Sequence, residues 1–161
     1  MHSALVLSKI ALRTPHSALR TEMTKGKYLA IDYGDRRVGL AISDYDKSIA
    51  FPRDFLVYKS LTDLIEQIKK LCETEQVVKI ILGLPIEMDG TFGERFVKTQ
   101  KFGDALKKAV DPITVDYFDE RLTTKQSIHK LHEQGIKAKE QKGQRDMVSA
   151  QIILEAYLKS L

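Results

Sequence analysis

Two short apolar runs separated by a polar, glycine-containing turn constrain the fold of this chain more than any other feature. The first run covers Tyr28–Ile31 and ends at a carboxylate, Asp32, and the second covers Val38–Ile42. Apolar runs of this length, joined by a short turn that contains Gly34, predict a β-hairpin. Asp32 would then end a buried strand, where a substrate can reach it. An ordinary hairpin in which Asp32 caps the turn explains the same residues.

The hydrophobic pattern beyond the hairpin predicts a single α/β domain. The expected order is three strands, a helix, a strand, a helix, a strand and further helices, with the later strands at 49–58, 77–84 and 113–118. The run at 77–84 is almost wholly apolar and follows a helix-like segment. That arrangement is typical of a buried strand in a parallel crossover, so the central sheet is expected to be mixed.

Capping patterns predict where the helices begin. Three pairs of residues have the spacing of N-terminal caps: Ser60 with Asp63, Thr91 with Glu94, and Thr123 with Gln126. After the third pair, residues 135–145 are expected to form a basic, glycine-containing loop. Asp146 would begin the last helix.

The length and composition are those of an ordinary globular domain. The chain has 161 residues, of which 43% are hydrophobic and 30% charged, enough to bury a core. No apolar run approaches the ~20 residues of a membrane-spanning helix, and we expect a cytoplasmic protein. Residues 1–26 are predicted to be an N-terminal extension, either a disordered tail or residues before a start at Met23, and the domain would cover 27–161. The Ser, Thr and basic residues of this extension also resemble a transit peptide.

Basic residues gather in one part of the chain. The formal charge of the whole chain is only +4, but residues 121–145 contain seven basic and two acidic residues, a net charge of +5. A local patch of this kind indicates contact with a nucleic acid better than the total charge does. A solvated surface is the alternative.

Three acids stand at comparable positions in the predicted fold. Asp32 ends the first strand, Glu120 ends the last strand, and Asp146 begins the final helix. Sites in open α/β sheets lie outside the carboxyl ends of strands, so the three side chains can meet there. Carboxylates that crowd together need cations, and oxygen ligands suit Mg²⁺ or Mn²⁺. Two such ions would support phosphodiester hydrolysis, with Lys142 and Arg145 beside them.

Each of these acids also has an ordinary structural role. Asp146 could cap its helix, because a carboxylate is stabilised at a helix N-terminus. Glu120 could pair with Arg121 on the surface. The three positions together favour metal binding more than any one of them does alone.

Four motifs in order resemble the YqgF family, which is related to RuvC and has the ribonuclease H-like fold. They are Asp32-Tyr-Gly-Asp-Arg-Arg-Val-Gly-Leu-Ala, Gly83-Leu-Pro with Asp89-Gly-Thr, Asp119-Glu-Arg-Leu-Thr-Thr, and Asp146 before Ala150-Gln-Ile-Ile-Leu-Glu-Ala-Tyr-Leu. The resemblance implies a single ribonuclease H-like α/β domain with helices on both faces of the sheet. It implies that Asp32, Glu120 and Asp146 are catalytic metal ligands. The nucleic-acid-binding residues would be Arg37, Arg121, Lys125, Lys142 and Arg145.

Two activities are connected with this family, Holliday junction resolution and maturation of the 5′ end of precursor 16S ribosomal RNA. We expect the second: an endonuclease that uses Mg²⁺ or Mn²⁺ on precursor ribosomal RNA, as a monomer or homodimer. The alternatives are cleavage of branched DNA and a non-catalytic assembly factor that binds ribosomal RNA. An actin-like phosphotransferase is disfavoured, because it needs two domains and this chain has room for one.

Overall fold

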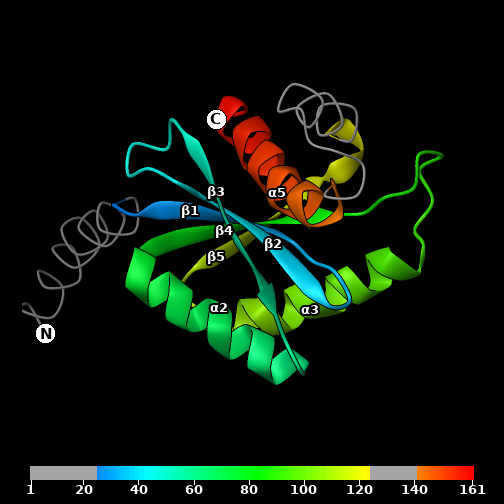
Figure 1. Ribbon diagram of the computed structural model, residues 1–161, viewed down its shortest axis with the longest axis horizontal. Coiled ribbons are helices and arrows are strands. Elements are labelled where there is room, and N and C mark those ends of the chain that lie inside the picture. The colour runs from blue at the N-terminus through cyan, green and yellow to red at the C-terminus, as the bar shows by residue number, and fades with distance from the viewer. Residues whose placement is uncertain (1–24, 124–140) are drawn as a thin grey trace, which may run out of the picture.

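The computed structural model describes residues 25–123 and 141–161, with 141–147 described through their backbone alone. Five strands form one sheet in the order β3-β2-β1-β4-β5, with helices on both of its faces (Figure 1). In chain order the elements are β1 (Lys27–Asp32), β2 (Arg37–Ser43), β3 (Ala50–Val57), α2 (Leu61–Glu75), β4 (Val77–Leu84), α3 (Glu94–Val110), β5 (Thr114–Asp119), the 3-10 turn η1 (Glu120–Leu122) and α5 (Gln141–Lys159). The predicted α/β class and mixed sheet are confirmed.

The sheet combines an antiparallel half and a parallel half. β1 pairs with β2, and β2 with β3, in antiparallel fashion, which confirms the predicted hairpin. β1 pairs with β4, and β4 with β5, in parallel, as the apolar run at 77–84 predicted. The carboxyl ends of β1, β4 and β5 therefore meet at one edge of the sheet, which we call the carboxyl edge. Asp32 lies on this edge.

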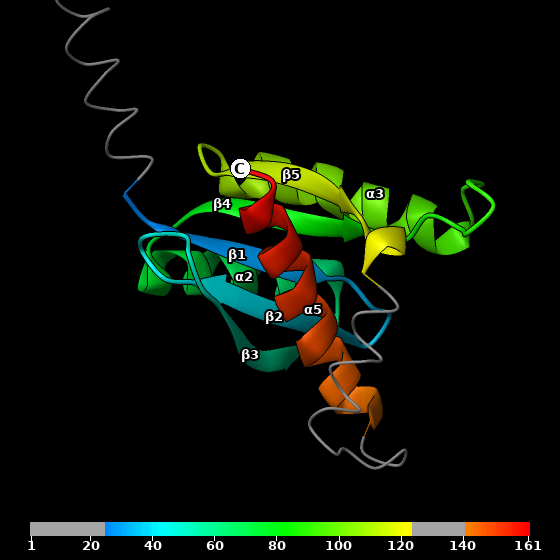
Figure 2. The same cartoon turned by 90° about the horizontal axis from the view of Figure 1, so that it is seen from above.

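Side chains along the central strand β1 alternate between two hydrophobic cores, one on each face of the sheet. Leu29 and Ile31 belong to the core beneath α2 and α3, whereas Ala30 belongs to the core beneath α5. Successive side chains of a strand point to opposite faces, so Asp32 follows Ala30 onto the α5 face. Figure 2 shows α5 crossing the sheet obliquely on that face. None of the helices in the described ranges is long and apolar enough to cross a membrane.

The helix boundaries confirm one capping prediction and correct another. The Ser60 hydroxyl accepts a hydrogen bond from the backbone N–H of Asp63, 3.1 Å away, and caps α2 as predicted. The cap expected at Thr91 is wrong, because α3 begins at Glu94 after Gly93 and has no side-chain cap. Thr91 instead donates its backbone N–H and its hydroxyl to the Asp89 carboxylate, at 2.9 and 2.6 Å, in a tight turn.

The last helix begins earlier than its sequence indicated. α5 starts at Gln141, so the end of the basic loop expected at 135–145 is helical, and Asp146 lies in the second turn rather than at the start. The proposed capping role of Asp146 is therefore wrong. The cap expected at Thr123 and Gln126, and the extension 1–26 except for its last two residues, lie outside the described ranges.

Candidate active site

Asp32 lies between two strands that present glycines to it. In the β1–β2 ladder Asp32 is paired with Gly39. On the other side, β1 and β4 are in register at Ile31 and Leu82, so Gly83 follows as the neighbour of Asp32. Adjacent strands are only about 4.8 Å apart. Two neighbours without side chains therefore allow another side chain to approach the Asp32 carboxylate closely.

Glu120 directs its carboxylate over Gly83. A Cβ atom built on Gly83 would lie 2.5 Å from Glu120 Oε1 and 2.8 Å from Ile153 Cδ1 of α5. Glu120 therefore occupies the space between β4 and α5. Because Asp32 is on the same face and on the adjoining strand, the two predicted acids lie on either side of the Gly83 backbone.

The backbone of α5 brings the third predicted acid toward the same face. Asp146 lies seven residues, about two helical turns, before Ile153. Figure 2 shows η1 at the end of β4 and β5, whereas the N-terminal half of α5 extends past β2 and β3. Among the side chains that the structure describes, no group of three His, Cys, Asp or Glu is placed to hold a metal ion, and that set does not include Asp146.

Aromatic side chains on the α2 and α3 side of the sheet hold the turn that follows Asp32. The Tyr58 hydroxyl donates a hydrogen bond to the Gly34 carbonyl oxygen, 2.6 Å away. The Tyr33 ring stacks on Phe102 of α3, with ring centroids 4.4 Å apart. A Cβ atom at Gly34 would lie 2.5 Å from the Arg37 carbonyl oxygen, so this tight turn requires glycine. These contacts fix the backbone at the end of β1.

Arg121 is bound to the acid that precedes Glu120. Its Nε lies 2.9 Å and its Nη2 2.6 Å from Asp119 Oδ2, and its backbone N–H bonds Asp119 Oδ1 at 2.9 Å. These hydrogen bonds from Arg121 hold the pKa of the Asp119 carboxyl below its ordinary value of 3.8. The pair orients the Arg121 guanidinium toward the β4–α3 loop, where Nη1 lies 3.8 Å from a Cβ built on Gly90.

The structure describes the remaining predicted basic residues to different extents. Arg37 begins β2 and alternates with Gly39, which places it on the same face as Asp32, with its guanidinium 5.0 Å from the Phe55 ring centroid. Lys142 and Arg145 lie in the first turns of α5, described through their backbone. Lys125 lies outside the described residues.

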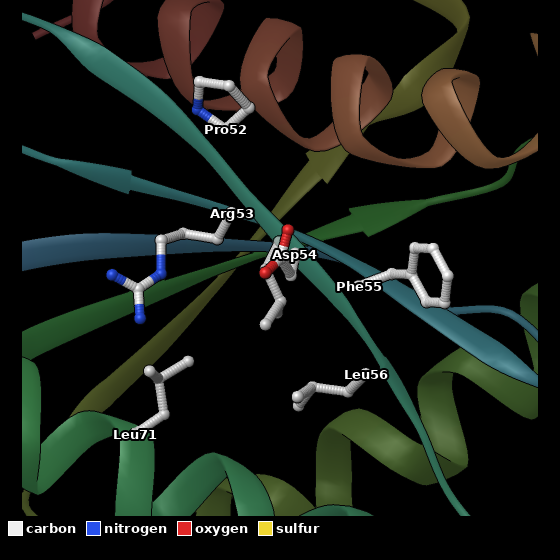
Figure 3. A pocket seen from close by; sticks show the side chains of 7 residues that line it. Pro52, Arg53, Asp54, Phe55, Leu56 and Leu71 are labelled. Atoms are coloured by element: carbon white, nitrogen blue, oxygen red, sulfur yellow. The ribbon is translucent and has the colours of Figure 1, made fainter.

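A surface hollow of about 490 Å³ lies elsewhere, between β3 and α2 (Figure 3). Arg53, Leu56 and Leu71 line it, and Arg53 is bound there to Glu75 of α2, with Nη1 2.7 Å from Oε1. Leu56 and Leu71 pack on the core beneath α2 and α3. Phe55 also lines the hollow, which therefore lies at the β3 edge of the sheet, separated from Glu120 by β2, β1 and β4.

Sequence reasoning missed the residues that shape the space around the acids. Gly83 is part of the Gly83-Leu-Pro motif, but its contact with the Glu120 carboxylate depends on the strand order. The sequence around Tyr58 does not indicate its contact with the Gly34 turn, because a tyrosine after an edge strand is common on protein surfaces. Asp119 was part of the Asp-Glu-Arg motif, and its side-chain pairing with Arg121 was not anticipated.

The mixed five-stranded sheet with helices on both faces defines the ribonuclease H-like fold class. More particularly, the chain belongs to the RuvX family, whose model is described as a Holliday junction resolvase and matches residues 26–160. The expected YqgF membership is thereby confirmed.

Several curated relatives that match most of this chain are named "Putative pre-16S rRNA nuclease". The protein from Halothermothrix orenii is 41% identical over 82% of this chain and 94% of its own length. The protein from Syntrophomonas wolfei is 38% identical over 82% and 93%, and that from Rickettsia bellii 37% over 83% and 86%.

Two solved structures share the fold. RuvC from T. thermophilus, in complex with a Holliday junction substrate, has a TM-score of 0.54 and 11% identity over 84% of this chain and 94% of its own. The Fowlpox virus resolvase, in complex with Holliday junction DNA, has a TM-score of 0.52 and 15% identity over 83% and 97%. At these identities the likeness shows the ribonuclease H-like fold alone.

Proposed function

We propose that this chain is a divalent-metal-dependent endonuclease that matures the 5′ end of precursor 16S ribosomal RNA in the cytoplasm. The observation that carries the proposal is the position of Glu120 across Gly83 from Asp32 at the carboxyl edge. The names of the relatives support precursor 16S ribosomal RNA as the substrate. Fold and family support hydrolysis of phosphodiester bonds.

The donor set fits a hard divalent cation. Asp32, Glu120 and Asp146 offer only oxygen ligands, which suit Mg²⁺ or Mn²⁺. In this role the three acids would hold two ions. When bound, such ions activate a water molecule and neutralise charge at the scissile phosphate.

The chain's own residues bind and orient the substrate. Arg37, on the face of Asp32, would contact a phosphate next to the scissile one. Arg121 is held by Asp119 and would contact the strand near the β4–α3 loop, while Lys125, Lys142 and Arg145 would extend the cationic surface. Contacts of this kind position a nucleic acid without reading its sequence, so they suit either RNA or DNA.

Cleavage of branched DNA is the second candidate function. The description of the family model as a Holliday junction resolvase favours it. That reaction needs two active sites on opposed strands, and therefore a symmetric dimer, whereas cleavage of ribosomal RNA is possible for a monomer.

The deciding experiment compares two substrates. A labelled precursor 16S ribosomal RNA fragment and a synthetic four-way DNA junction are each incubated with Mn²⁺, with Mg²⁺ and with chelator, using wild type and Asp32→Asn. We expect cutting of the RNA alone, dependent on metal and lost in the variant. Cutting of the junction alone would establish the resolvase. Binding of the RNA without cutting would favour a non-catalytic assembly factor.

A further inference from the structure

The edge strand β3 contains a β-bulge in line with Asp32. Val38 of β2 pairs with Leu56, and Leu40 pairs with Arg53, so two residues of β3, Asp54 and Phe55, lie opposite the single residue Gly39. Gly39 is itself the partner of Asp32 in the next ladder. The bulge and the proposed catalytic acid therefore stand in one row across the sheet.

The bulge separates the side chains of β3 into two groups. Arg53 and Leu56 both reach the α2 side, where Arg53 binds Glu75 and Leu56 packs on the core. Phe55 extends away from Arg53 and Leu71 (Figure 3). Bulges near active sites commonly redirect a side chain in this way. Here the redirected side chain is an aromatic ring.

The Phe55 ring meets Arg37. The guanidinium carbon of Arg37 lies 5.0 Å from the ring centroid, within the range of a cation–π contact. Arg37 is paired with Val57 and lies two residues from Gly39, so it stands close to the row that contains Asp32. An arginine side chain has many rotamers, and stacking on a ring restricts them.

We propose that Phe55 is a positioning residue, which holds the Arg37 guanidinium beside Asp32 for a backbone phosphate of the substrate. This inference rests on the proposed function, because it requires Arg37 to contact the nucleic acid. It adds Phe55, at the bulge of β3, to the residues that shape the substrate-binding surface. It also gives the bulge a role, since a regular strand would not place two residues opposite Gly39.

The test is a binding assay in chelator, so that no cleavage takes place, with a fluorescent precursor 16S ribosomal RNA fragment as the probe. Phe55→Leu keeps an apolar side chain but removes the π face, and we expect binding to weaken about two- to fivefold. Phe55→Tyr keeps the ring and should bind as wild type. Phe51→Leu changes a phenylalanine of the same strand, 48% exposed, and should also bind as wild type.

A double-variant comparison separates positioning from a general structural effect. Arg37→Ala should weaken binding and reduce the salt dependence by about one phosphate contact. In that background Phe55→Leu should cause no further loss, because the ring has nothing left to hold. An equal loss in both backgrounds, or a failure of Phe55→Tyr to bind as wild type, would overturn the inference. Thermal unfolding of every variant checks that it is folded.

Failure of this inference is distinguishable from failure of the proposed function. If Arg37→Ala binds the RNA as wild type does, the positioning role of Phe55 is wrong, and cleavage by the wild type remains to be judged by itself. If the RNA is bound but not cut in the presence of metal, the nuclease proposal fails. Coupling between Phe55 and Arg37 would still be measurable in that case.

Discussion

The carboxylate of Glu120 fills the space in which a side chain at Gly83 would lie, with Oε1 2.5 Å from the position of the absent Cβ. Glu120 follows β5 and Gly83 lies in β4, the strand between β5 and β1. Because Gly83 has no side chain, the acid that follows β5 can approach Asp32 at the end of β1, on the same face of the sheet. A glycine here serves close packing of a functional group rather than an unusual backbone angle.

Gly83→Ala should impair both cleavage and stability. The added methyl group would meet Glu120 Oε1 and, at 2.8 Å, Ile153 Cδ1, so both the acid and α5 must shift. We expect unfolding to become easier by about 1–3 kcal/mol, and cleavage to fall on the order of 100-fold, as misplaced catalytic groups do. Urea denaturation and the RNA cleavage assay measure the two effects.

Gly103→Ala is the matched control for that substitution. Its added Cβ would crowd the Tyr117 hydroxyl and lie 2.9 Å from Tyr117 Cε1, on the opposite face of the sheet from Glu120. A similar loss of stability with normal cleavage, measured well below the unfolding temperature, is expected. Equal cleavage defects in the two variants would mean that loss of packing alone explains the effect at Gly83.

Asp32→Asn should abolish cleavage and leave RNA binding intact. The amide keeps the size of the side chain but removes the charge that holds a cation, whereas binding depends on the basic residues. Gel shift in chelator and cleavage in Mn²⁺ test the two halves of this prediction. Asp35→Asn, which changes an exposed acid of the same turn, should cleave normally. A fully active Asp32→Asn would remove this acid from the proposed mechanism.

Tyr58→Phe should loosen the turn that carries Asp32. The variant loses the 2.6 Å hydrogen bond to the Gly34 carbonyl and keeps the ring that packs beside Tyr33. A loss of about 1 kcal/mol in the free energy of unfolding follows from one such bond. Tyr45→Phe removes an exposed hydroxyl bonded to Gln76 and should cost less in the same urea titration. An equal loss in the free energy of unfolding for the two variants would show that the hydrogen bond to Gly34 stabilises the fold no more than the exposed one does.

The Asp119–Arg121 pair should stabilise the fold above the acid range. Arg121 lowers the pKa of Asp119 in the folded state, so the unfolded chain takes up a proton first as the pH falls. The contribution is therefore complete above the unfolded pKa of about 3.9 and is lost as the pH falls through the folded pKa. Asp119→Asn should show a smaller decrease in thermal midpoint between pH 5 and pH 2 than wild type. Parallel curves would contradict the assignment.

Much of the fold could be predicted from local patterns. The hairpin around Gly34 and the Ser60 cap each depend on a few adjacent residues, and the structure confirms them. The prediction at Thr91 failed because α3 begins at Glu94, after Gly93, while Thr91 belongs to a turn in which it donates to Asp89. The spacing of Thr91 and Glu94 alone does not show whether Thr91 caps a helix or belongs to a turn.

The sequence by itself determined the succession of strands and helices, and which residues end them, since periodicity and turn chemistry are local properties. Only the tertiary structure decided that β4 lies between β1 and β5, so that Gly83 separates Asp32 from Glu120. It also decided that the bulge at Phe55 stands in the row of Asp32. Strand order and register arise from packing among segments far apart in the chain, and no short stretch of sequence encodes such contacts.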